Sequence, residues 1–403
     1  MKERSMAAWI SMDEACRLLG VQPQTVYAYV SRGKLEVVPD AADTRRSLYR
    51  ADDVTALAKR KKEGRKHETV AANALFGAEP SIPTALCSFV RGRLYYRGKE
   101  VVSLAQTATL EEAASLLWEA DQAVDFGSDA LKRRGKGSAE PGRVAAFTAL
   151  ANLAAIGHST HGRLKRVLRD EAQGLIGLLA NAFGALPGGD QPLHRRFAQG
   201  WGQTQAVGEL LRMAMVLLAD HELTSSAFSA RIAASTGASL PACLLAGLAT
   251  LSGPLHGDAS GRVHALFGEV ERLGEDQVID QYLSTALPLA GFGHPIYPDG
   301  DPRAAALLAG FDPPKVIARF ISKVRSLTGL EPNIDAALAA LVARYQLPID
   351  AAFGLFATSR SVGLLAHSME QLDVGQVIRP RGRYVGVTQQ DLGPFQRRRP
   401  ISS

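Results

Sequence analysis

The chain has few cysteines and no pattern that would pair them. Cys16, Cys87 and Cys243 are its three cysteines in 403 residues, and they lie far apart without any C-x-x-C spacing. The sequence therefore indicates neither a disulfide framework nor a zinc site. It favours a reducing compartment, and we expect a cytoplasmic protein.

Long apolar runs and cofactor-binding loops are also absent. No stretch approaches the roughly 20 apolar residues that a membrane span needs, and the first twenty residues lack the apolar core of a signal peptide. No G-x-G-x-x-G or Walker sequence indicates a nucleotide fold, and no H-E-x-x-H sequence or carboxylate cluster indicates a metal. We therefore expect no membrane partner, no metal and no permanently bound cofactor.

What the chain does have is material for a large core and an uneven charge. Its 403 residues are 46% hydrophobic and 21% charged, which is typical of a globular protein of two or three domains. The net charge is +6, and residues 1–70, with fourteen Lys and Arg against ten Asp and Glu, carry +4 of it. This shift in composition marks a small N-terminal unit.

Two short helices are predicted at the start of that unit. Ser11 and Glu14 have the S-x-x-E spacing of a capping box, which opens a helix that Gly20 ends. Pro23 stands where the first turn of a second helix, over residues 23–34, would begin, and proline is favoured there. Two such helices joined by a glycine-containing turn make a helix-turn-helix.

A β-hairpin is predicted next, over residues 35–50, with a basic tip at its turn. The unit, residues 1–66, resembles the winged helix-turn-helix of the MerR and excisionase families, which place the second helix in the DNA major groove. The resemblance implies six DNA contacts: Gln24, Thr25, Tyr27, Arg32, Arg45 and Arg46. The alternative is a helical appendage with merely solvated basic residues. A net charge of +4 gives only weak electrostatic attraction between a monomer and DNA, so dimerisation would have to help the binding.

The rest of the chain is predicted to be mostly α-helical. A Pro/Ala/Gly linker over residues 67–81 leads into two strand-like runs within residues 85–101. Beyond residue 105 apolar residues recur at helical spacing in runs such as LEEAASLLWEA, RVAAFTALANLAAI and GELLRMAMVLLADHEL. Several of these helices are apolar nearly all round, which favours the interior of a large core or a dimer interface.

Chemically active side chains are concentrated in four short segments of this domain. The segments are ADHELTSSAFSAR (219–231), LSGPLHGDAS (251–260), GFGHPIYPDGDPRA (291–304) and EPNIDAAL (331–338). Each places a histidine or an aspartate beside glycine, beside proline or near a helix end. The candidate residues, with two arginines further along the chain, are His221, His256, His294, Arg303, Asp335, Arg360 and Arg379.

Each candidate taken alone has a structural explanation. A histidine between glycines is often a turn residue, and an aspartate near a helix start is more often a cap than a base. Together, three histidines on rigid turns, one carboxylate and three separated arginines suit proton transfer combined with a clamp for several anionic groups. Arginine is the side chain that binds carboxylates in a bidentate manner.

Six motifs, in this order, resemble the citrate synthase family, which includes 2-methylcitrate synthase. They are RGRLYYRGKEVVSLAQTATLEEAASLLWEA, DHELTSSAFSAR, GPLHGDAS, GFGHPIYPDGDPRA, PNIDAAL and IRPRGRYVG. The resemblance runs from about residue 82 to about 390. It implies a mainly α fold with a large and a small domain over residues 82–395, the small one roughly 258–350. It also implies a homodimer that condenses acetyl-CoA with oxaloacetate and water to give citrate and CoA.

The resemblance also assigns a role to each candidate. Asp335 matches the base that removes a proton from the thioester methyl group. His256 matches the histidine that stabilises the enol(ate) oxygen, and His294 the one that polarises the oxaloacetate carbonyl and protonates the new alkoxide. Residues matching oxaloacetate ligands are His221, Arg303 and Arg360, and Arg379 matches an arginine lent across the dimer interface.

Departures from the family pattern leave two alternatives open. The usual GPLHGGANE reads GPLHGDASG here, with Asp258, Ser260 and Gly261 in place of Gly, Asn and Glu, and Ala290 replaces a usual proline. The resemblance implies that these changes affect affinity and rate on the thioester side more than they affect oxaloacetate binding. The alternatives are a 2-methylcitrate synthase that uses propionyl-CoA, and a catalytically weak metabolite sensor that regulates transcription through its N-terminal unit.

Overall fold

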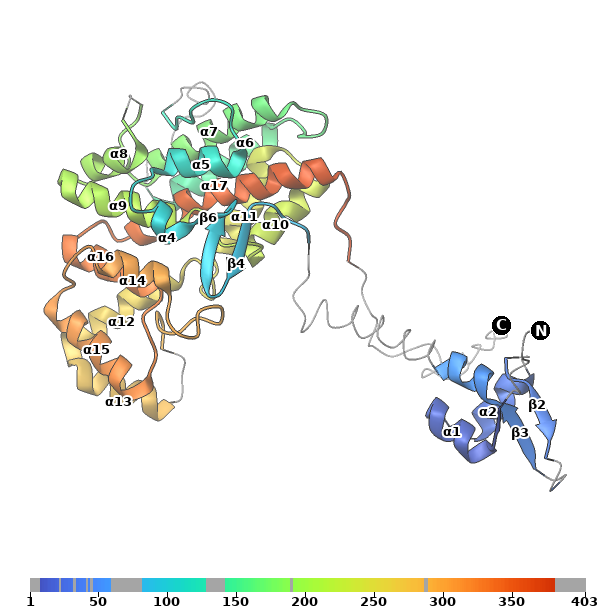
Figure 1. Cartoon of the computed structure of the whole chain (residues 1–403). Coiled ribbons are helices and arrows are strands. Elements are labelled where there is room, and N and C mark those ends of the chain that lie inside the picture. The colour runs from blue at the N-terminus through green and yellow to red at the C-terminus, as the bar shows by residue number, and fades with distance from the viewer. Residues whose placement is uncertain are drawn as a thin grey trace, which may run out of the picture. The chain divides into compact units, whose positions relative to one another are not determined.

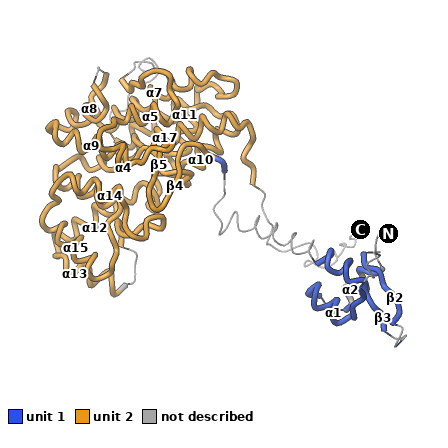
Figure 2. The backbone as a smooth tube through the Cα atoms, viewed as in Figure 1, with its two compact units in different colours: residues 1–83, 381–403 blue, residues 84–380 orange. Residues whose placement is uncertain are grey.

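A computed structural model describes most of the chain and divides it into two compact units (Figure 1). The described residues are 8–21, 23–31, 34–40, 43, 46–58, 82–127, 142–188, 191–285 and 289–380. One unit comprises residues 1–83 with 381–403, and the other residues 84–380 (Figure 2). The two units are described separately below.

The N-terminal unit contains the two predicted helices and a small antiparallel sheet. Helix α1 (Met12–Leu19) begins with the predicted capping box of Ser11 and Glu14, and the left-handed Gly20 ends it. Helix α2 is Pro23–Ser31, and residues 51–58 are also helical. The strands are β1 (Trp9–Ile10), β2 (Val37–Pro39) and β3 (Ser47–Arg50), in the order β1-β3-β2.

Six buried side chains, drawn from both helices and the sheet, form the core of this unit: Ala15, Leu19, Val26, Leu35, Tyr49 and Val54. The predicted hairpin is present as the pair β2–β3, with Val37 opposite Tyr49. Of the predicted DNA contacts, Tyr27 and Arg46 are exposed and Thr25 is half-buried. Arg32, Arg45 and the side chain of Gln24 lie outside the described residues.

The larger unit opens with a three-stranded antiparallel sheet and continues as helices. The strands β4 (Cys87–Val90), β5 (Arg93–Tyr96) and β6 (Lys99–Glu100) are hydrogen-bonded in that order. The helices that follow are α4 (Val101–Leu104), α5 (Leu110–Trp118), α6 (Arg143–Ile156), α7 (Lys165–Ala182), α8 (Leu193–Gly200), α9 (Gln205–Leu218), α10 (Ser225–Ser235), α11 (Leu240–Leu251), α12 (Ala259–Leu273), α13 (Glu275–Thr285), α14 (Pro302–Leu308), α15 (Lys315–Thr328), α16 (Ile334–Tyr345) and α17 (Ala351–Val374). The predicted mainly α fold is thus confirmed.

Helix α17 lies at the centre of the first helix group, which comprises α4 to α11 and α17. It packs against α10, α11, α7, α9 and α5, and every residue from Ala351 to Met369 is buried (Figure 1). A surface helix would show an apolar stripe only, so a helix buried all round marks the middle of a large core. The polar residues on this helix therefore need partners inside the protein.

The second helix group comprises α12 to α16, drawn in yellow and orange in Figure 1. Helix α12 packs against α16, α15 and α13, and α14 packs against α16. The boundaries of 258 and 350 for a small domain, like the other domain boundaries, stay predictions. No helix in the described part of the chain combines the length and the apolar character needed to cross a bilayer.

Candidate active site

Backbone hydrogen bonds join two of the four motif segments, 291–304 and 331–338. The Gly293 N–H donates to the Glu331 carbonyl and the Asn333 N–H to the Gly291 carbonyl, both at 2.8 Å. The Asn333 side chain donates to the Gly293 carbonyl at 3.1 Å. Gly291 has φ +83°, and a Cβ there would come within 2.7 Å of Val263, so this turn requires glycine. The segment that carries His294 is thereby fixed beside the start of α16.

Asp301 extends this connection to Arg303. Its carboxylate caps α14 by accepting from the Arg303 N–H at 3.0 Å, and it accepts from the guanidinium Nε at 3.0 Å and Nη2 at 2.8 Å. The same carboxylate accepts from the Ile334 N–H at 3.0 Å, at the start of α16. Both Asp301 and Arg303 are buried. One carboxylate therefore fixes the arginine relative to the helix that carries Asp335.

Asp335 itself is not the cap of its helix. The side chain of Asn333 caps α16 by accepting from the Asp335 and Ala336 N–H groups. Oδ1 of Asp335 is buried and has no hydrogen-bond partner among the described residues. Burial raises the pKa of Asp335 to about 7, against the opposing effect of the Arg303 charge. A carboxyl group with a near-neutral pKa and a free oxygen suits a general base.

The rings of His221 and His294 lie side by side in an edge-to-face arrangement. Their ring centroids are 5.4 Å apart, and Nε2 of His221 is 3.0 Å from the Tyr297 hydroxyl. The Ile296 N–H donates to Nδ1 of His294 at 3.2 Å. Burial lowers the pKa of both rings, and the Arg303 charge lowers each further. Both imidazoles are therefore neutral at physiological pH.

His256 contacts a serine of α10, which belongs to the motif segment 219–231. Its Nε2 is 2.8 Å from the hydroxyl of Ser226, which is fully buried. Burial, followed by the Arg360 charge, lowers the pKa of His256 to about 4. Because Nε2 is taken up by Ser226, Nδ1 is the ring nitrogen left to face a ligand.

Arg360 lies on α17, and its surroundings differ from those of Arg303, which is paired with Asp301. Its Nε donates to the Leu218 carbonyl at 2.9 Å, and its guanidinium carbon lies 4.9 Å from the Phe356 ring centre. Among the described residues no carboxylate forms an ion pair with it. A buried guanidinium without a contacting counter-ion suits the binding of an anionic ligand, because it is otherwise costly.

Six of the seven predicted side chains are thus brought near one another, and Arg379 is not. After burial, the charges of Arg303 and Arg360 act on the pKa of His221, and the same two charges act on that of Asp335. The Arg360 charge also acts on the pKa of His256. Arg379 is exposed, and in the described part of the chain no hydrogen bond or ion pair joins it to the other six. Its assignment stays a prediction.

The departures beside His256 have a structural counterpart. Asp258 forms an ion pair with Arg143 at 2.7 Å, and the Arg143 guanidinium stacks 3.8 Å from the Phe353 ring centre. This pair joins the start of α12 to the start of α6. Ser260 is buried and Ala290 packs against the core.

Sequence reasoning missed four residues that contact or adjoin the candidates: Tyr297, Asp301, Ser226 and Asp220, the last of which precedes His221 and lies 3.4 Å from His367. Asp301 carried a usable signal, because Asp followed by Pro at a helix start is typical of an N-cap with proline at N1. The other three contact residues that are distant in the sequence, so no local pattern indicates them.

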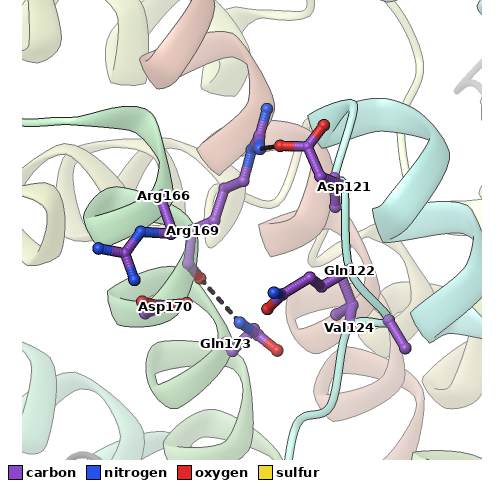
Figure 3. Close-up of a pocket in the computed structure, with 9 residues that line it drawn as sticks. Asp121, Gln122, Val124, Arg166, Arg169, Asp170 and Gln173 are labelled. Atoms are coloured by element: carbon purple, nitrogen blue, oxygen red, sulfur yellow. Dashed lines mark hydrogen bonds and ion pairs between the residues drawn. The ribbon is translucent and has the colours of Figure 1, made fainter.

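A separate surface pocket of about 120 Å³ lies between residues 120–124 and α7 (Figure 3). Its arginine Arg169 is paired with Asp121 at 3.1 Å, and Gln173 donates to the Arg169 carbonyl at 3.5 Å. None of the predicted site residues lines it. Within the described ranges no cluster of three histidines, cysteines or carboxylates could hold a metal ion.

Comparison with protein families gives one match over most of the chain. The family model described as "Citrate synthase, C-terminal domain" matches residues 78–381. The citrate synthase of Haloferax volcanii is 33% identical over 209 residues, covering 48% of this chain and 54% of that protein. The 2-methylcitrate synthase 2 of Corynebacterium glutamicum is 28% identical over 195 residues, covering 46% and 51%. The chain thus spans about half the length of the curated relatives it matches.

Solved structures with the same fold cover more of the chain. The citrate synthase of Thermotoga maritima aligns with a TM-score of 0.66 and 25% identity, over 80% of this chain and 98% of that one. That of Thermoplasma acidophilum, solved with carboxymethyl coenzyme A and oxaloacetate, aligns with a TM-score of 0.65 and 23% identity, over the same shares. At 23% identity, the similarity to the Thermoplasma acidophilum structure is a similarity of fold alone.

Proposed function

Because the chain belongs to the citrate synthase family, we propose that it condenses acetyl-CoA with oxaloacetate and water to give citrate and CoA. The observation that carries the proposal is the half-buried Asp335, whose Oδ1 is buried without a hydrogen-bond partner among the described residues. Its pKa is raised to about 7, and it lies among three neutral histidines and two arginines. A base of this strength can take a proton from a thioester methyl group while neutral imidazoles donate to the oxygens on which charge develops.

The proposed reaction begins with Asp335 and His256. Asp335 accepts the proton from the methyl carbon of acetyl-CoA, and the electron pair moves to the thioester oxygen, where His256 donates a hydrogen bond. For a neutral His256 to donate through Nδ1, its Nε2 must accept from the hydroxyl of Ser226, and the 2.8 Å contact permits this. Ser226 would thereby set the tautomer that stabilises the enol(ate).

The second step forms the carbon–carbon bond. The enol(ate) carbon attacks the oxaloacetate carbonyl carbon, and His294 donates its proton to the new alkoxide. Water then adds to the citryl thioester, and cleavage of the carbon–sulfur bond releases citrate and CoA. The hydrogen bond from Ile296 N–H to Nδ1 of His294 leaves the proton on Nε2, so Nε2 is the donor in this proposal.

Oxaloacetate would be held through its two carboxylates. We assign them to Arg303 and Arg360, with His221 as a further ligand. Arg303 already carries a carboxylate on Nε and Nη2, so its Nη1 is the atom left for substrate. The exposed position of Arg379 supports the proposal that it enters the site of a second subunit of a homodimer.

A second candidate is the same reaction with propionyl-CoA, which the 2-methylcitrate synthase among the relatives favours. The deciding experiment measures release of free thiol from acetyl-CoA and from propionyl-CoA, each with oxaloacetate. We expect release with acetyl-CoA at the higher kcat/KM. A higher kcat/KM with propionyl-CoA would favour the second candidate, and no release with either donor from folded protein would contradict both.

The pKa of Asp335 predicts the pH dependence of the reaction. Since the base must be ionised, kcat/KM should fall as pH decreases through about 7, approaching a tenfold loss per pH unit. His256, with its pKa lowered to about 4, stays neutral across this range and adds no second transition above pH 5. Steady-state rates from pH 5.5 to 8.5 measure this, and a flat profile would contradict the assignment of the base.

For the N-terminal unit we propose DNA binding of the winged helix-turn-helix kind. The arrangement of α1, α2 and the β2–β3 pair supports it, as does the exposure of Tyr27 on α2. The alternatives are a protein-docking appendage and, for the whole chain, a metabolite sensor. A ligand would change DNA affinity only if it preferred one arrangement of the protein over another. Gel shifts with and without oxaloacetate test the sensor alternative, because oxaloacetate should change the affinity for DNA only if the protein is a sensor.

Arg46→Ala tests the DNA contact directly. Arg46 is exposed and forms an ion pair with the nearby Asp43 at 3.4 Å. Its loss should weaken DNA binding and lower the salt slope by about one. Binding to the duplex upstream of the protein's own gene would be titrated at several salt concentrations. Arg93→Ala, an exposed arginine of the larger unit, serves as the control. Equal slopes in wild type and Arg46→Ala would remove this contact from the proposal.

A further inference from the structure

Helix α17 carries a stripe of residues that continues beyond Arg360. Gly363, His367 and Glu370 follow it at spacings of three or four residues, so all four lie along one side of the helix. His367 is fully buried, and the proposed reaction gives it no role. A buried imidazole needs hydrogen-bond partners.

The carboxylate of Asp220 packs directly on this stripe. Its Oδ1 lies 3.4 Å from Nε2 of His367, and a Cβ at Gly363 would stand 2.3 Å from the same oxygen. The Gly363 N–H donates to the Ala219 carbonyl at 3.0 Å, which holds the turn against the helix. Glycine at 363 therefore makes the space that Asp220 occupies.

The partners of His367 fix which ring nitrogen carries its proton. Nη1 of Arg231 lies 3.3 Å from Nδ1, and a guanidinium can only donate. Nδ1 must therefore accept, which places the ring's proton on Nε2, 3.4 Å from Oδ1 of Asp220. Oδ2 of Asp220 accepts from the Glu222 N–H at 3.3 Å, so both of its oxygens face donors.

Glu370 holds the other end of this chain of contacts. Its Oε2 lies 2.5 Å from Nη1 of Arg231, whose side chain is fully buried. The same carboxylate accepts from the Thr84 hydroxyl at 2.8 Å and from the Ala85 N–H at 2.7 Å. Contacts thus run from Glu370 through Arg231 to His367. The last one, between Nε2 of His367 and Oδ1 of Asp220, is an ion-pair contact at 3.4 Å, and neither atom has a hydrogen-bond partner among the described residues.

Asp220 is the residue before His221, and its turn also contacts Arg360. The Leu218 carbonyl accepts from Arg360 Nε at 2.9 Å. The Tyr96 hydroxyl lies 3.0 Å from both the backbone N and the carbonyl of Asp220. A shift of this turn would therefore move a proposed substrate ligand and remove a support of another.

We propose that His367 is a positioning residue for oxaloacetate binding: fixed by Arg231 and Glu370, it holds Asp220 and with it the turn 218–222 that places His221 and supports Arg360. The inference rests on the proposed function, because oxaloacetate is the ligand in question. A role in packing alone would need only the volume of the ring. A positioning role needs one acceptor facing Arg231 and one donor facing Asp220.

Two substitutions of similar size separate these roles. His367→Gln keeps an amide oxygen for Arg231 and an N–H for Asp220, whereas His367→Leu keeps neither. Oxaloacetate affinity would be measured by isothermal titration calorimetry, which does not depend on turnover. We expect about tenfold weaker binding for His367→Leu and less than threefold for His367→Gln, with the acetyl-CoA KM at saturating oxaloacetate unchanged in both.

A second pair of variants keeps the test valid if His367→Leu does not fold. Glu370→Gln weakens the hold on Arg231 and should lower oxaloacetate affinity about threefold. Asp373→Asn is its control, on the same helix but paired with Lys165 at the surface. Wild-type affinity in both His367→Leu and Glu370→Gln would overturn the inference, as would equal losses in Glu370→Gln and Asp373→Asn. A wild-type protein that binds no oxaloacetate would instead overturn the proposed function, and the inference with it.

Discussion

Replacing Asp335 with alanine should lower kcat by about 10² to 10⁴, the range that general-base catalysis supplies. The carboxylate is the proposed acceptor of the methyl proton, and its buried Oδ1 has no hydrogen-bond partner among the described residues that could take over. Oxaloacetate binding should persist, because Arg303 keeps its place through Asp301 without any contact to Asp335. Thiol release and calorimetric titration of oxaloacetate measure the two quantities separately.

Two controls make this result specific. Asp335→Asn keeps the side-chain volume but cannot act as a base, so it should lose as much activity as the alanine variant. Asp312→Ala removes an exposed carboxylate from the same helix group and should leave kcat unchanged. Near-normal turnover in Asp335→Ala would show that the fourth motif has been assigned wrongly.

Replacing Arg360 with alanine should act on binding rather than on chemistry. A hydrogen bond to a charged group contributes roughly 1.5–3 kcal/mol, which corresponds to about a 10- to 150-fold weaker oxaloacetate complex. The effect should be in the upper part of this range, because the guanidinium is fully buried and no carboxylate of the described residues forms an ion pair with it. Calorimetry gives the dissociation constant, and steady-state rates give the oxaloacetate KM.

Arg360→Lys tests the geometry separately from the charge. Lysine keeps the positive charge but has neither the Nε that donates to the Leu218 carbonyl nor the planar fork that binds a carboxylate. We expect it to recover only part of the affinity. Arg319→Ala removes an exposed arginine that is paired with Glu275, and it provides the neutral comparison. Unchanged affinity in Arg360→Ala would remove this arginine from the oxaloacetate site.

Local patterns predicted the presence of the helices and some of their ends, although the helix predicted over residues 23–34 is Pro23–Ser31. The capping box of Ser11 and Glu14 and the left-handed Gly20 depend only on residues within one turn, so the sequence contains all the information. The same holds for α6, whose predicted residues 143–156 are those of the structure. The Gly and Pro content of residues 291–304 indicated a rigid turn, and its positive-φ glycines confirm that conformation.

The contacts that hold the site could not be predicted in this way. Asp220 meets His367 across 147 positions of the chain, and nothing near either residue indicates the other. The raised pKa of Asp335 depends on burial by the whole helix group, which no local motif encodes. Sequence therefore indicated the candidate side chains, whereas the environment that shifts their pKa values emerges only from tertiary packing.

The hydrogen bonds between residues 291–293 and 331–333 make His294, Arg303 and Asp335 parts of one rigid body. His221 and Arg360 belong to the first helix group. A small rotation of one group against the other would leave distances within each set unchanged and alter every distance between them. A dicarboxylate bridging Arg303 and Arg360 would fix that rotation. The order in which substrates are added should then matter, since the acyl donor would meet a correctly placed base only after oxaloacetate has bound.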